Sequence, residues 1–195
     1  DQRDSRSLLR QYAKGRTVLN AFSYTGSFSV ACASSGALSV ANVDTSWSAL
    51  KLARKNMEAN EKLYPQLDPK LVSYHKTDAL DHLRHTSDGT YDMIILDPPK
   101  FVPTKNSLYK GLRHYVELNK LAMGRLRPGG ILFSYSCSGH VSVDAFQNVM
   151  LTAAKQVGAD FKVLHTLSQP CDHPYSVHMP ETNYLKGFVL IKEHK

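Results

Sequence analysis

The chain has 195 residues, of which 42% are hydrophobic and 21% charged, a composition typical of one globular domain with a full core. It holds no apolar run long enough to span a bilayer, and three cysteines are too few for a disulfide framework, which favours a cytoplasmic protein with no membrane partner. The net charge of +7, from 24 Lys and Arg against 17 Asp and Glu, suits an anionic partner such as nucleic acid, and equally a solvated basic surface.

Strand-like and helix-period stretches alternate along the first half of the chain, as in a doubly wound α/β domain. The expected elements, in order, are a helix at 5–14, a strand at 17–22, a small-residue helix ending near Gly36, a strand at 38–43, a helix capped by Thr45 or Ser46 with Trp47, Leu50, Ala53 and Met57 on one face, and a strand at 71–76.

The second half continues the same alternation. Its expected elements are a strand at 91–96, a helix at 108–126, a turn at 127–130, a strand at 131–136, a helix marked by Val143, Phe146, Met150, Ala153 and Val157, and two late strands at 161–167 and 184–191. No repeat or linker divides the chain, so we expect residues 1–195 to form one domain. Because the chain opens at Asp1 without Met, we also expect it to be the C-terminal part of a longer protein.

A tight turn and two Asp residues follow the first three predicted strands, at the sheet edge where open α/β folds bind ligands. The first strand opens into a tight turn from Asn20 to Gly26, the second ends at Asp44, and the third ends at Asp78. Asp44 is placed to accept the two hydroxyls of a ribose, and Asp78 to accept from an exocyclic amine such as that of adenine. Each carboxylate alone is more often a helix cap, but the three in order predict a nucleoside cofactor.

The first turn discriminates between nucleoside cofactors. Dinucleotide-binding folds need several glycines to pass a pyrophosphate over a helix start, and this turn has one glycine with bulky Phe22 and Tyr24. S-adenosylmethionine has no phosphate, so it fits better than NAD.

Two later strands deliver a carboxylate and a thiol. One run ends in Asp97-Pro98-Pro99, and the next strand ends in Ser136-Cys137-Ser138. A thiolate that adds to carbon 6 of cytosine makes carbon 5 nucleophilic enough to accept a methyl group. We therefore expect Cys137 to be the nucleophile, with its pKa lowered by an electropositive strand end, and Asp97 to face the ring nitrogen N3. The alternative is that Cys137 is a small buried hydrophobe.

The other cysteines and the histidines give no metal site. Cys32 lies in a small-residue helix, and Cys171 with His173 and His178 is too sparse for a ligand set. We expect Cys32 and Cys171 to be structural or incidental.

The chain resembles the bacterial large-ribosomal-subunit RNA cytosine-5 methyltransferases that join a PUA-like domain, a β-rich middle domain and a C-terminal methyltransferase domain. The resemblance rests on Asp1-Gln-Arg-Asp-Ser-Arg6, Val18-Leu-Asn-Ala-Phe-Ser-Tyr-Thr-Gly26, Val43-Asp-Thr-Ser46, Leu96-Asp-Pro-Pro-Lys-Phe101, Phe133-Ser-Tyr-Ser-Cys-Ser138, Asp172-His-Pro174 and Tyr184-Leu-Lys-Gly-Phe188. It implies a Rossmann-like class I fold with a seven-stranded, mostly parallel sheet and a C-terminal antiparallel hairpin. It also implies S-adenosylmethionine as donor, large-subunit ribosomal RNA as substrate, 5-methylcytosine as product and Cys137 as nucleophile.

The strand-end argument and the resemblance together give the expected sites. The catalytic pair is Cys137 and Asp97. The expected cofactor residues are Arg3, Asn20, Phe22, Tyr24, Thr25, Gly26, Asp44, Thr45, Ser46, Asp78, Ala79, Asp97 and Pro98, and the expected substrate residues are Pro99, Lys100 and Phe101. The wider two-cysteine class of RNA cytosine-5 enzymes has a second Cys where this chain has Lys100. The family that the chain resembles also lacks this Cys, so product release needs another base, which the sequence does not identify.

The RNA surface and the reaction keep alternatives. Phosphate contacts are expected among Lys100, Lys105, Lys110, Arg113, Lys120, Arg125 and Arg127, which equally suit a solvated helix face, and a stacking partner for the base among Phe101, Tyr109 and Tyr135. The rival reactions are methylation of a base nitrogen and, in another class, an RNA-binding module with a vestigial cofactor fold. The sequence does not indicate the oligomeric state.

Overall fold

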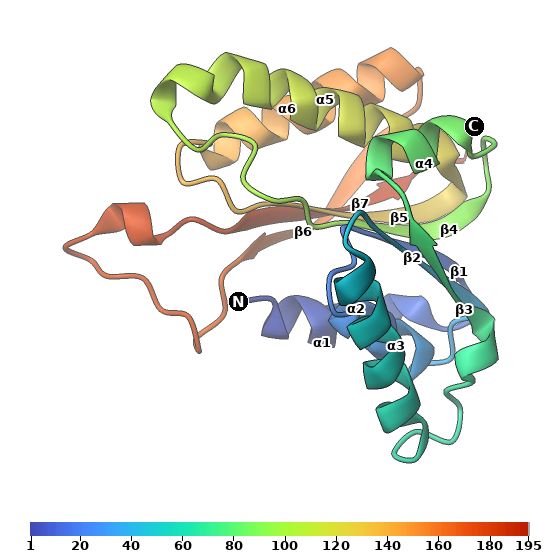
Figure 1. The fold of residues 1–195 in the computed structure, drawn as a ribbon. Helices are drawn as coiled ribbons and strands as arrows, with labels where there is room; N and C mark the ends of the chain where they lie inside the picture. Colours follow the sequence, from blue (N-terminus) through green and yellow to red (C-terminus); the bar gives the residue numbers. More distant parts are fainter. Residues whose placement is uncertain (195) are drawn as a thin grey trace.

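The computed structural model describes residues 1–194 and is built around one seven-stranded sheet (Figure 1). The strand order is β3-β2-β1-β4-β5-β7-β6. The strands are β1 (Thr17–Ala21), β2 (Ser39–Asp44), β3 (Val72–Lys76), β4 (Tyr91–Leu96), β5 (Leu126–Ser136), β6 (Phe161–Ser168) and β7 (Lys186–Lys192). The first five pair in parallel, and β7 lies antiparallel between β5 and β6. The predicted mostly parallel sheet with a C-terminal antiparallel hairpin is confirmed.

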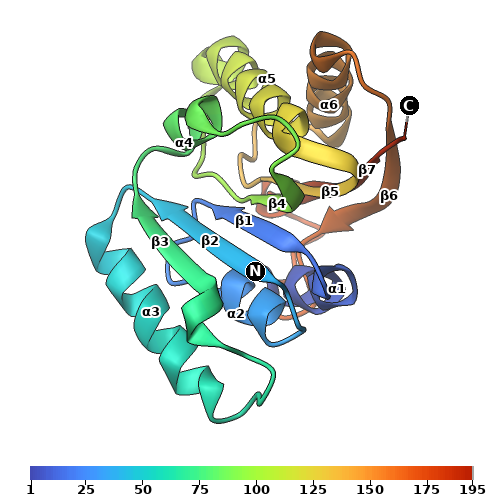
Figure 2. The same ribbon diagram turned by 90° about the vertical axis from the view of Figure 1, so that its right-hand side faces the viewer.

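Helices cover both faces of the sheet (Figures 1 and 2). One face carries α1 (Arg3–Ala13), α2 (Ser27–Ala33) and α3 (Trp47–Glu61), and the other carries α4 (Ala79–His85), α5 (Leu108–Arg125) and α6 (Val143–Val157). Short 3-10 helices lie at Pro69–Leu71, Lys105–Ser107 and Pro180–Thr182. Because both faces are covered, the central strands are continuous hydrophobic runs rather than alternating ones.

Strand β4 shows how the two cores arise from one strand. Met93 and Ile95 pack with α1 and α2, whereas Ile94 and Leu96 pack with α4, α5 and α6, and all four are fully buried. Among the described residues, no helix is both long enough and apolar enough to cross a membrane.

The carboxyl ends of the parallel strands meet where the strand order reverses. Strand β1 lies between β2 and β4, and Ala21 pairs with Val43 on one side and Leu96 on the other. In this fold class the ligand crevice opens at such a reversal. The next pairing, Leu96 with Ser134, brings the end of β5 to the same edge.

Side-chain caps begin three of the helices. Ser46, not Thr45, caps α3, since its hydroxyl accepts from the Ala49 N–H. Asp78 caps α4 by accepting from the N–H groups of Leu80 and Asp81, and Ser142 caps α6. Helix α4 was not among the elements expected from the sequence.

Three local expectations were wrong. The segment 127–130 is not a turn before β5 but lies inside it, where the register with β4 shifts between Tyr91 and Met93. Trp47 and Val143 were expected on buried helix faces, yet each begins its helix and is 45% and 46% exposed. Both residues stand at the first position of their helices, where the helical period alone does not determine burial.

Gly111 of α5 lies against the loop that follows β4. A Cβ at this position would contact the Val102 side chain and lie 2.7 Å from the Phe101 carbonyl oxygen. We predict that Gly111→Ala destabilises the protein by about 1–3 kcal/mol through overpacking, as measured by urea unfolding. Gly124→Ala in the same helix is the matched control, because its nearest neighbour, Asp88, is 3.8 Å away, and it should stabilise by up to about 1 kcal/mol. Equal effects would contradict the close contact.

Candidate active site

The turn after β1 is strained and held from two sides. Phe22 and Tyr24 have φ angles of 59° and 47°, values that side-chain-bearing residues rarely adopt. Gly26 has φ 75°, and a Cβ there would lie 2.8 Å from the Ala53 Cβ of α3. The Ser23 N–H donates to the Val43 carbonyl at 3.0 Å. Backbone strain of this kind persists where the surroundings enforce it, and it clusters at ligand sites.

Asp44 at the end of β2 fastens this turn. One carboxylate oxygen accepts from the Tyr24 N–H at 2.9 Å, and the other accepts from the Ser46 N–H at 2.8 Å. A carboxylate has about four acceptor positions, so each oxygen keeps one for a ligand hydroxyl.

A pocket of about 200 Å³ opens beside Asp44, at the carboxyl ends of β1, β2, β3 and β4. It brings together seven of the residues expected from the sequence: Phe22, Asp44, Thr45, Asp78, Ala79, Pro99 and Phe101. The apolar side chains of Val43 and Leu80 also line it, and His114 contributes from α5. Thr77 completes the lining. Sequence reasoning missed all four as site residues, and His114 could be placed there only by the fold, because it comes from α5, far along the chain.

Asp78 combines two roles that had been weighed as alternatives. One of its oxygens caps α4, accepting from the Leu80 N–H at 2.8 Å and the Asp81 N–H at 3.2 Å. The residue also lines the pocket, where its second oxygen is available to an amine. A helix cap and a cofactor contact are therefore compatible here.

Asn20 lies behind the turn rather than at its surface. It is 1% exposed, and its amide donates to the Ser29 hydroxyl at 2.8 Å, which in turn donates to Asn42 at 2.6 Å. This buried chain ties β1 and β2 to α2. The Asn20 Oδ1 atom has no hydrogen-bond partner among the described residues, and its expected cofactor contact stays a prediction.

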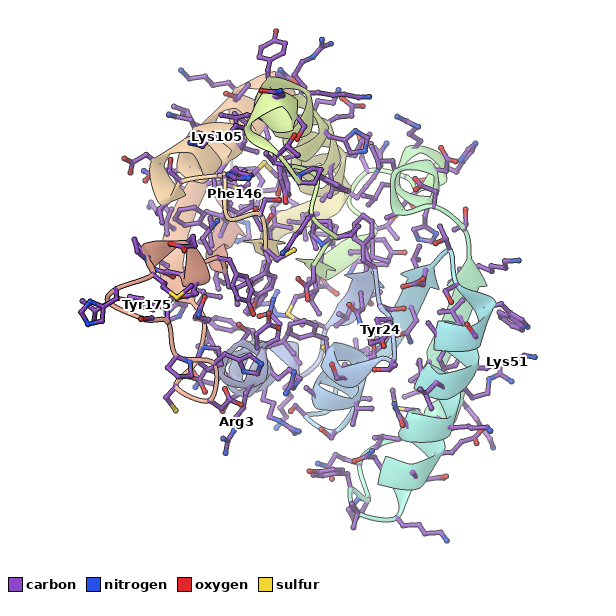
Figure 3. The ribbon with its side chains drawn as sticks, turned by 60° about the vertical axis from the view of Figure 1, so that its left-hand side comes forward. Arg3, Tyr24, Lys51, Lys105, Phe146 and Tyr175 are labelled. Carbon is purple, nitrogen blue, oxygen red and sulfur yellow. The ribbon has the colours of Figure 1, made fainter. Side chains whose placement is uncertain are left out.

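Gln2, which the sequence reasoning missed, reaches the site from the start of α1. Its side-chain amide donates to Asp97 at 3.2 Å, and the residue is 6% exposed. The expected residue Arg3 is exposed, and in Figure 3 its side chain projects outward from the molecular surface. Gln2 therefore contacts Asp97 whereas Arg3 faces outward, and the cofactor role expected for Arg3 stays a prediction.

Cys137 and Asp97 are brought together as predicted. The Cys137 Sγ lies 3.6 Å from the Pro98 carbonyl oxygen, directly after Asp97, and the thiol is partly buried. Cys32 is fully buried in α2 and Cys171 is exposed in the loop before β7. Cys137 thus differs from the other two cysteines because it is partly buried and lies against the Asp97-Pro98 segment.

The electrostatics of this pair differ in part from expectation. Burial raises the pKa of Asp97 from the usual 3.8 to about 6, although the hydrogen bond from Gln2 opposes the shift. The pKa of the Cys137 thiol is also raised, first by burial and then by the Asp97 charge, against the opposing charges of Lys100 and Lys186. The predicted lowering of the thiol pKa is wrong for the protein alone, because α6 begins only at Val143 and offers Cys137 no helix N-terminus.

A buried hydroxyl network fixes the two loops that carry the pair. The Ser136 hydroxyl donates to Tyr115 Oη at 2.9 Å, and Tyr115 Oη lies 3.1 Å from the Ser138 hydroxyl. Ser138 Oγ also accepts from the Val102 N–H at 3.2 Å. The residues on both sides of Cys137 are therefore joined to α5 and to the loop after Asp97.

The three aromatic candidates for base stacking differ in exposure and in contacts. Tyr135 is fully buried, so it is not available to a base. Phe101 packs against His114 and Tyr115, with ring centroids 4.7 and 4.8 Å away, and lines the pocket. Tyr109 is 76% exposed at the start of α5.

Several of the basic residues are engaged within the protein. Lys120 pairs with Glu117, Arg125 with Asp88 and Arg127 with Asp92. Lys100 and Pro99 are exposed beside the pair, and the Lys100 ammonium lies 5.8 Å from the Tyr184 ring centroid. Lys105, Lys110 and Arg113 continue the basic surface into the first turns of α5.

The S-adenosylmethionine-dependent methyltransferase family matches residues 1–180 of this chain. The chain belongs to this family. It is 46% identical over 190 residues to the ribosomal RNA large subunit methyltransferase I of Yersinia pseudotuberculosis and 45% identical to that of Serratia proteamaculans. In both comparisons 96% of this chain is covered but 47% of the relative, so the chain spans about half the length of the relatives it matches.

Solved structures agree with this assignment. SMU.776, a protein assigned as a methyltransferase and solved in complex with SAH, is 29% identical and superimposes with a TM-score of 0.83 over 98% of this chain and 49% of its own. A SAM-dependent methyltransferase fold from Streptococcus mutans is 30% identical with a TM-score of 0.82, over 98% of this chain and 48% of its own. Trm5b from Pyrococcus abyssi, at 18% identity and a TM-score of 0.67, shares the fold.

The residues present fit the cofactor of the family, S-adenosylmethionine. Asp44 keeps acceptor positions for ribose hydroxyls, and the pocket beside it has apolar walls with the Asp78 carboxylate at one edge, as a flat amino-heterocycle requires. The Oε1 atom of Gln2 and the hydroxyl of Ser23 are buried without a hydrogen-bond partner among the described residues. Unsatisfied buried atoms at such a site are those that a polar ligand satisfies. The described residues hold no group of three metal-ligating side chains.

Asp97→Asn tests the raised pKa through stability. The folded-state pKa of about 6 lies above the usual 3.8, so the folded protein keeps a proton that the unfolded chain releases, and stability falls as the pH rises through this interval. The stability gain of the variant over wild type should therefore be larger at about pH 7.5 than at about pH 4.5, by about 2 kcal/mol. Urea unfolding at the two pH values measures this, and an equal difference at both would contradict the shift.

Proposed function

We propose that this domain, residues 1–195, transfers a methyl group from S-adenosylmethionine to carbon 5 of a cytosine in large-subunit ribosomal RNA. The observation that carries the proposal is the contact of the Cys137 thiol with the Asp97-Pro98 segment. This contact lies at the same edge of the sheet as the turn after β1 and the pocket beside Asp44. The names of the two relatives from Yersinia and Serratia support the choice of large-subunit ribosomal RNA as substrate. With that substrate we propose a cytoplasmic location.

Cytosine requires covalent activation, because its carbon 5 does not attack a methyl donor unaided. In the proposed reaction the Cys137 thiolate adds to carbon 6, and the electrons of the 5,6 double bond move toward carbon 5 and the N3 side of the ring. Asp97 faces N3 and donates a hydrogen bond when it is protonated, which a pKa of about 6 allows for a fraction of molecules near neutral pH.

The Asp97 carboxyl and the Cys137 thiol lose one proton between them more readily than they lose two. The Asp97 charge raises the thiol pKa, so protonation of Asp97 favours the Cys137 thiolate. The productive form therefore has a neutral carboxyl and a charged sulfur. That arrangement combines the nucleophile and the N3 donor in one protonation state.

The remaining steps restore the enzyme. S-adenosylmethionine, when bound, supplies the methyl group from its sulfonium centre. Carbon 5 then bears both the methyl group and its original proton, and loss of that proton re-forms the double bond as the Sγ–C6 bond breaks. Pro99 and Phe101 line the pocket beside Asp44, and the exposed Lys100 between them in sequence would meet a phosphate of the flipped-out nucleotide.

The Cys137→Ala variant should lose methyl transfer by at least about 10³-fold while it binds S-adenosylmethionine within about threefold of wild type. Transfer is measured with labelled donor and unmodified large-subunit RNA, and binding by calorimetry. Cys171→Ser is the matched control, since that thiol is exposed in a distant part of the sequence, and it should leave both values unchanged. An Ala variant that methylates at the normal rate would exclude the covalent route.

Asp44→Ala should weaken S-adenosylmethionine binding by about 10- to 100-fold, because it removes two charge-assisted acceptors and releases the Tyr24 and Ser46 N–H groups. Calorimetry measures the affinity. Asp144→Ala, an exposed carboxylate in the first turn of α6, controls for loss of one negative charge. Unchanged affinity in the Asp44 variant would remove its ribose role.

A further inference from the structure

A buried lysine begins strand β7. Lys186 is 4% exposed, and its ammonium donates to the Ser138 carbonyl at 2.7 Å and to the Val141 carbonyl at 2.6 Å. The neighbouring Leu185 and Phe188 are apolar and buried, so an apolar residue would suit this position in the core equally well. Burying an ammonium costs free energy even when backbone carbonyls accept its hydrogen bonds. The fold alone does not account for this charge.

The position of Lys186 connects it to the nucleophile. Strand β7 runs antiparallel to β5, and Lys186 pairs directly with Ser136, the residue before Cys137. The two carbonyls that it binds belong to the segment that follows Cys137 and leads to α6. Its side chain therefore spans the loop on which the thiol sits.

The charges around Cys137 come from three side chains. Asp97 raises the thiol pKa, whereas Lys100 and, to a smaller extent, Lys186 lower it. Lys100 is exposed, so solvent and salt screen its effect. Lys186 is buried and held by two hydrogen bonds, so its charge acts at a fixed place through a medium that screens it less. Burial lowers the pKa of Lys186 to about 8, which leaves most of it charged at neutral pH, and Cys137 is the ionisable group whose charge opposes that lowering.

We propose that Lys186 is a positioning residue that holds the segment after Cys137 in place and stabilises the Cys137 thiolate with a fixed positive charge. This inference rests on the proposed function, in which that thiolate is the nucleophile. Lys186 acts through the sulfur and the loop, and it does not touch the base.

The test measures the rate at which the Cys137 thiol is alkylated rather than the rate of methyl transfer. Alkylation of Cys137 by iodoacetamide is followed against pH by peptide mass spectrometry, in a Cys171→Ser background that leaves the buried Cys32 as the other thiol. Lys186→Met removes the charge and the hydrogen bonds, Lys186→Gln removes the charge but keeps N–H donors, and Lys186→Arg keeps both. Circular dichroism and thermal melting establish that each variant is folded.

We expect the Met and Gln variants to alkylate about tenfold more slowly at neutral pH, with the pH profile of Cys137 displaced upward by about one pH unit, and the Arg variant to stay within about threefold of wild type. Hydrogen exchange of residues 138–141 should be faster in the Met variant. A folded Met variant with the wild-type alkylation profile would overturn the inference. If the Met variant does not fold, the Gln and Arg variants decide, and equal profiles for these two would overturn it.

This experiment separates the two proposals. A Cys137→Ala enzyme that still methylates would remove the covalent function, whereas the alkylation profile would still report whether Lys186 stabilises the thiolate.

Discussion

The parallel pairing of β4 with β5 determines the chemistry available to this domain. Because Leu96 pairs with Ser134, the residues that follow each strand leave the sheet at the same edge, and the Cys137 sulfur comes to 3.6 Å from the Pro98 carbonyl. Two further side chains reach this contact from helices on opposite faces of the sheet. Gln2 arrives from α1 to bind Asp97, and Tyr115 arrives from α5 to join the hydroxyls on both sides of Cys137.

Burial of Asp97 and Cys137 disfavours their charged forms, which costs free energy of folding. Both acids have raised pKa values, since each is partly removed from water and the Asp97 charge also disfavours the Cys137 thiolate. A site selected for stability alone would replace Asp97 and Lys186 with apolar or amide side chains. Their presence beside a thiol fits the proposed reaction, which moves one proton and one electron pair.

The sequence predicted the elements that depend on local pattern. Hydrophobic runs located the strands, Ser46 was a candidate cap, and the strand ends at Asp44, Asp78, Asp97 and Cys137 were placed at one edge by the rule for open α/β sheets. What it missed depends on tertiary placement. Gln2, His114 and Lys186 reach the site from distant elements, and the pKa direction of Cys137 depends on burial that no motif encodes. Helix α4 was missed because its seven residues are too short to establish a period, whereas α2, of equal length, was expected from its small residues.

The central claim is that a transient bond forms between the Cys137 sulfur and carbon 6 of a cytosine. Its most direct test is mass spectrometry of the protein after incubation with S-adenosylmethionine and large-subunit RNA in which cytosine carries fluorine at carbon 5. Because fluorine cannot leave as a proton does, the reaction should stop with methylated RNA attached to the peptide that contains Cys137. Methylation of normal RNA with no covalent complex on the fluorinated RNA, or a methyl group found on a base nitrogen, would contradict the account.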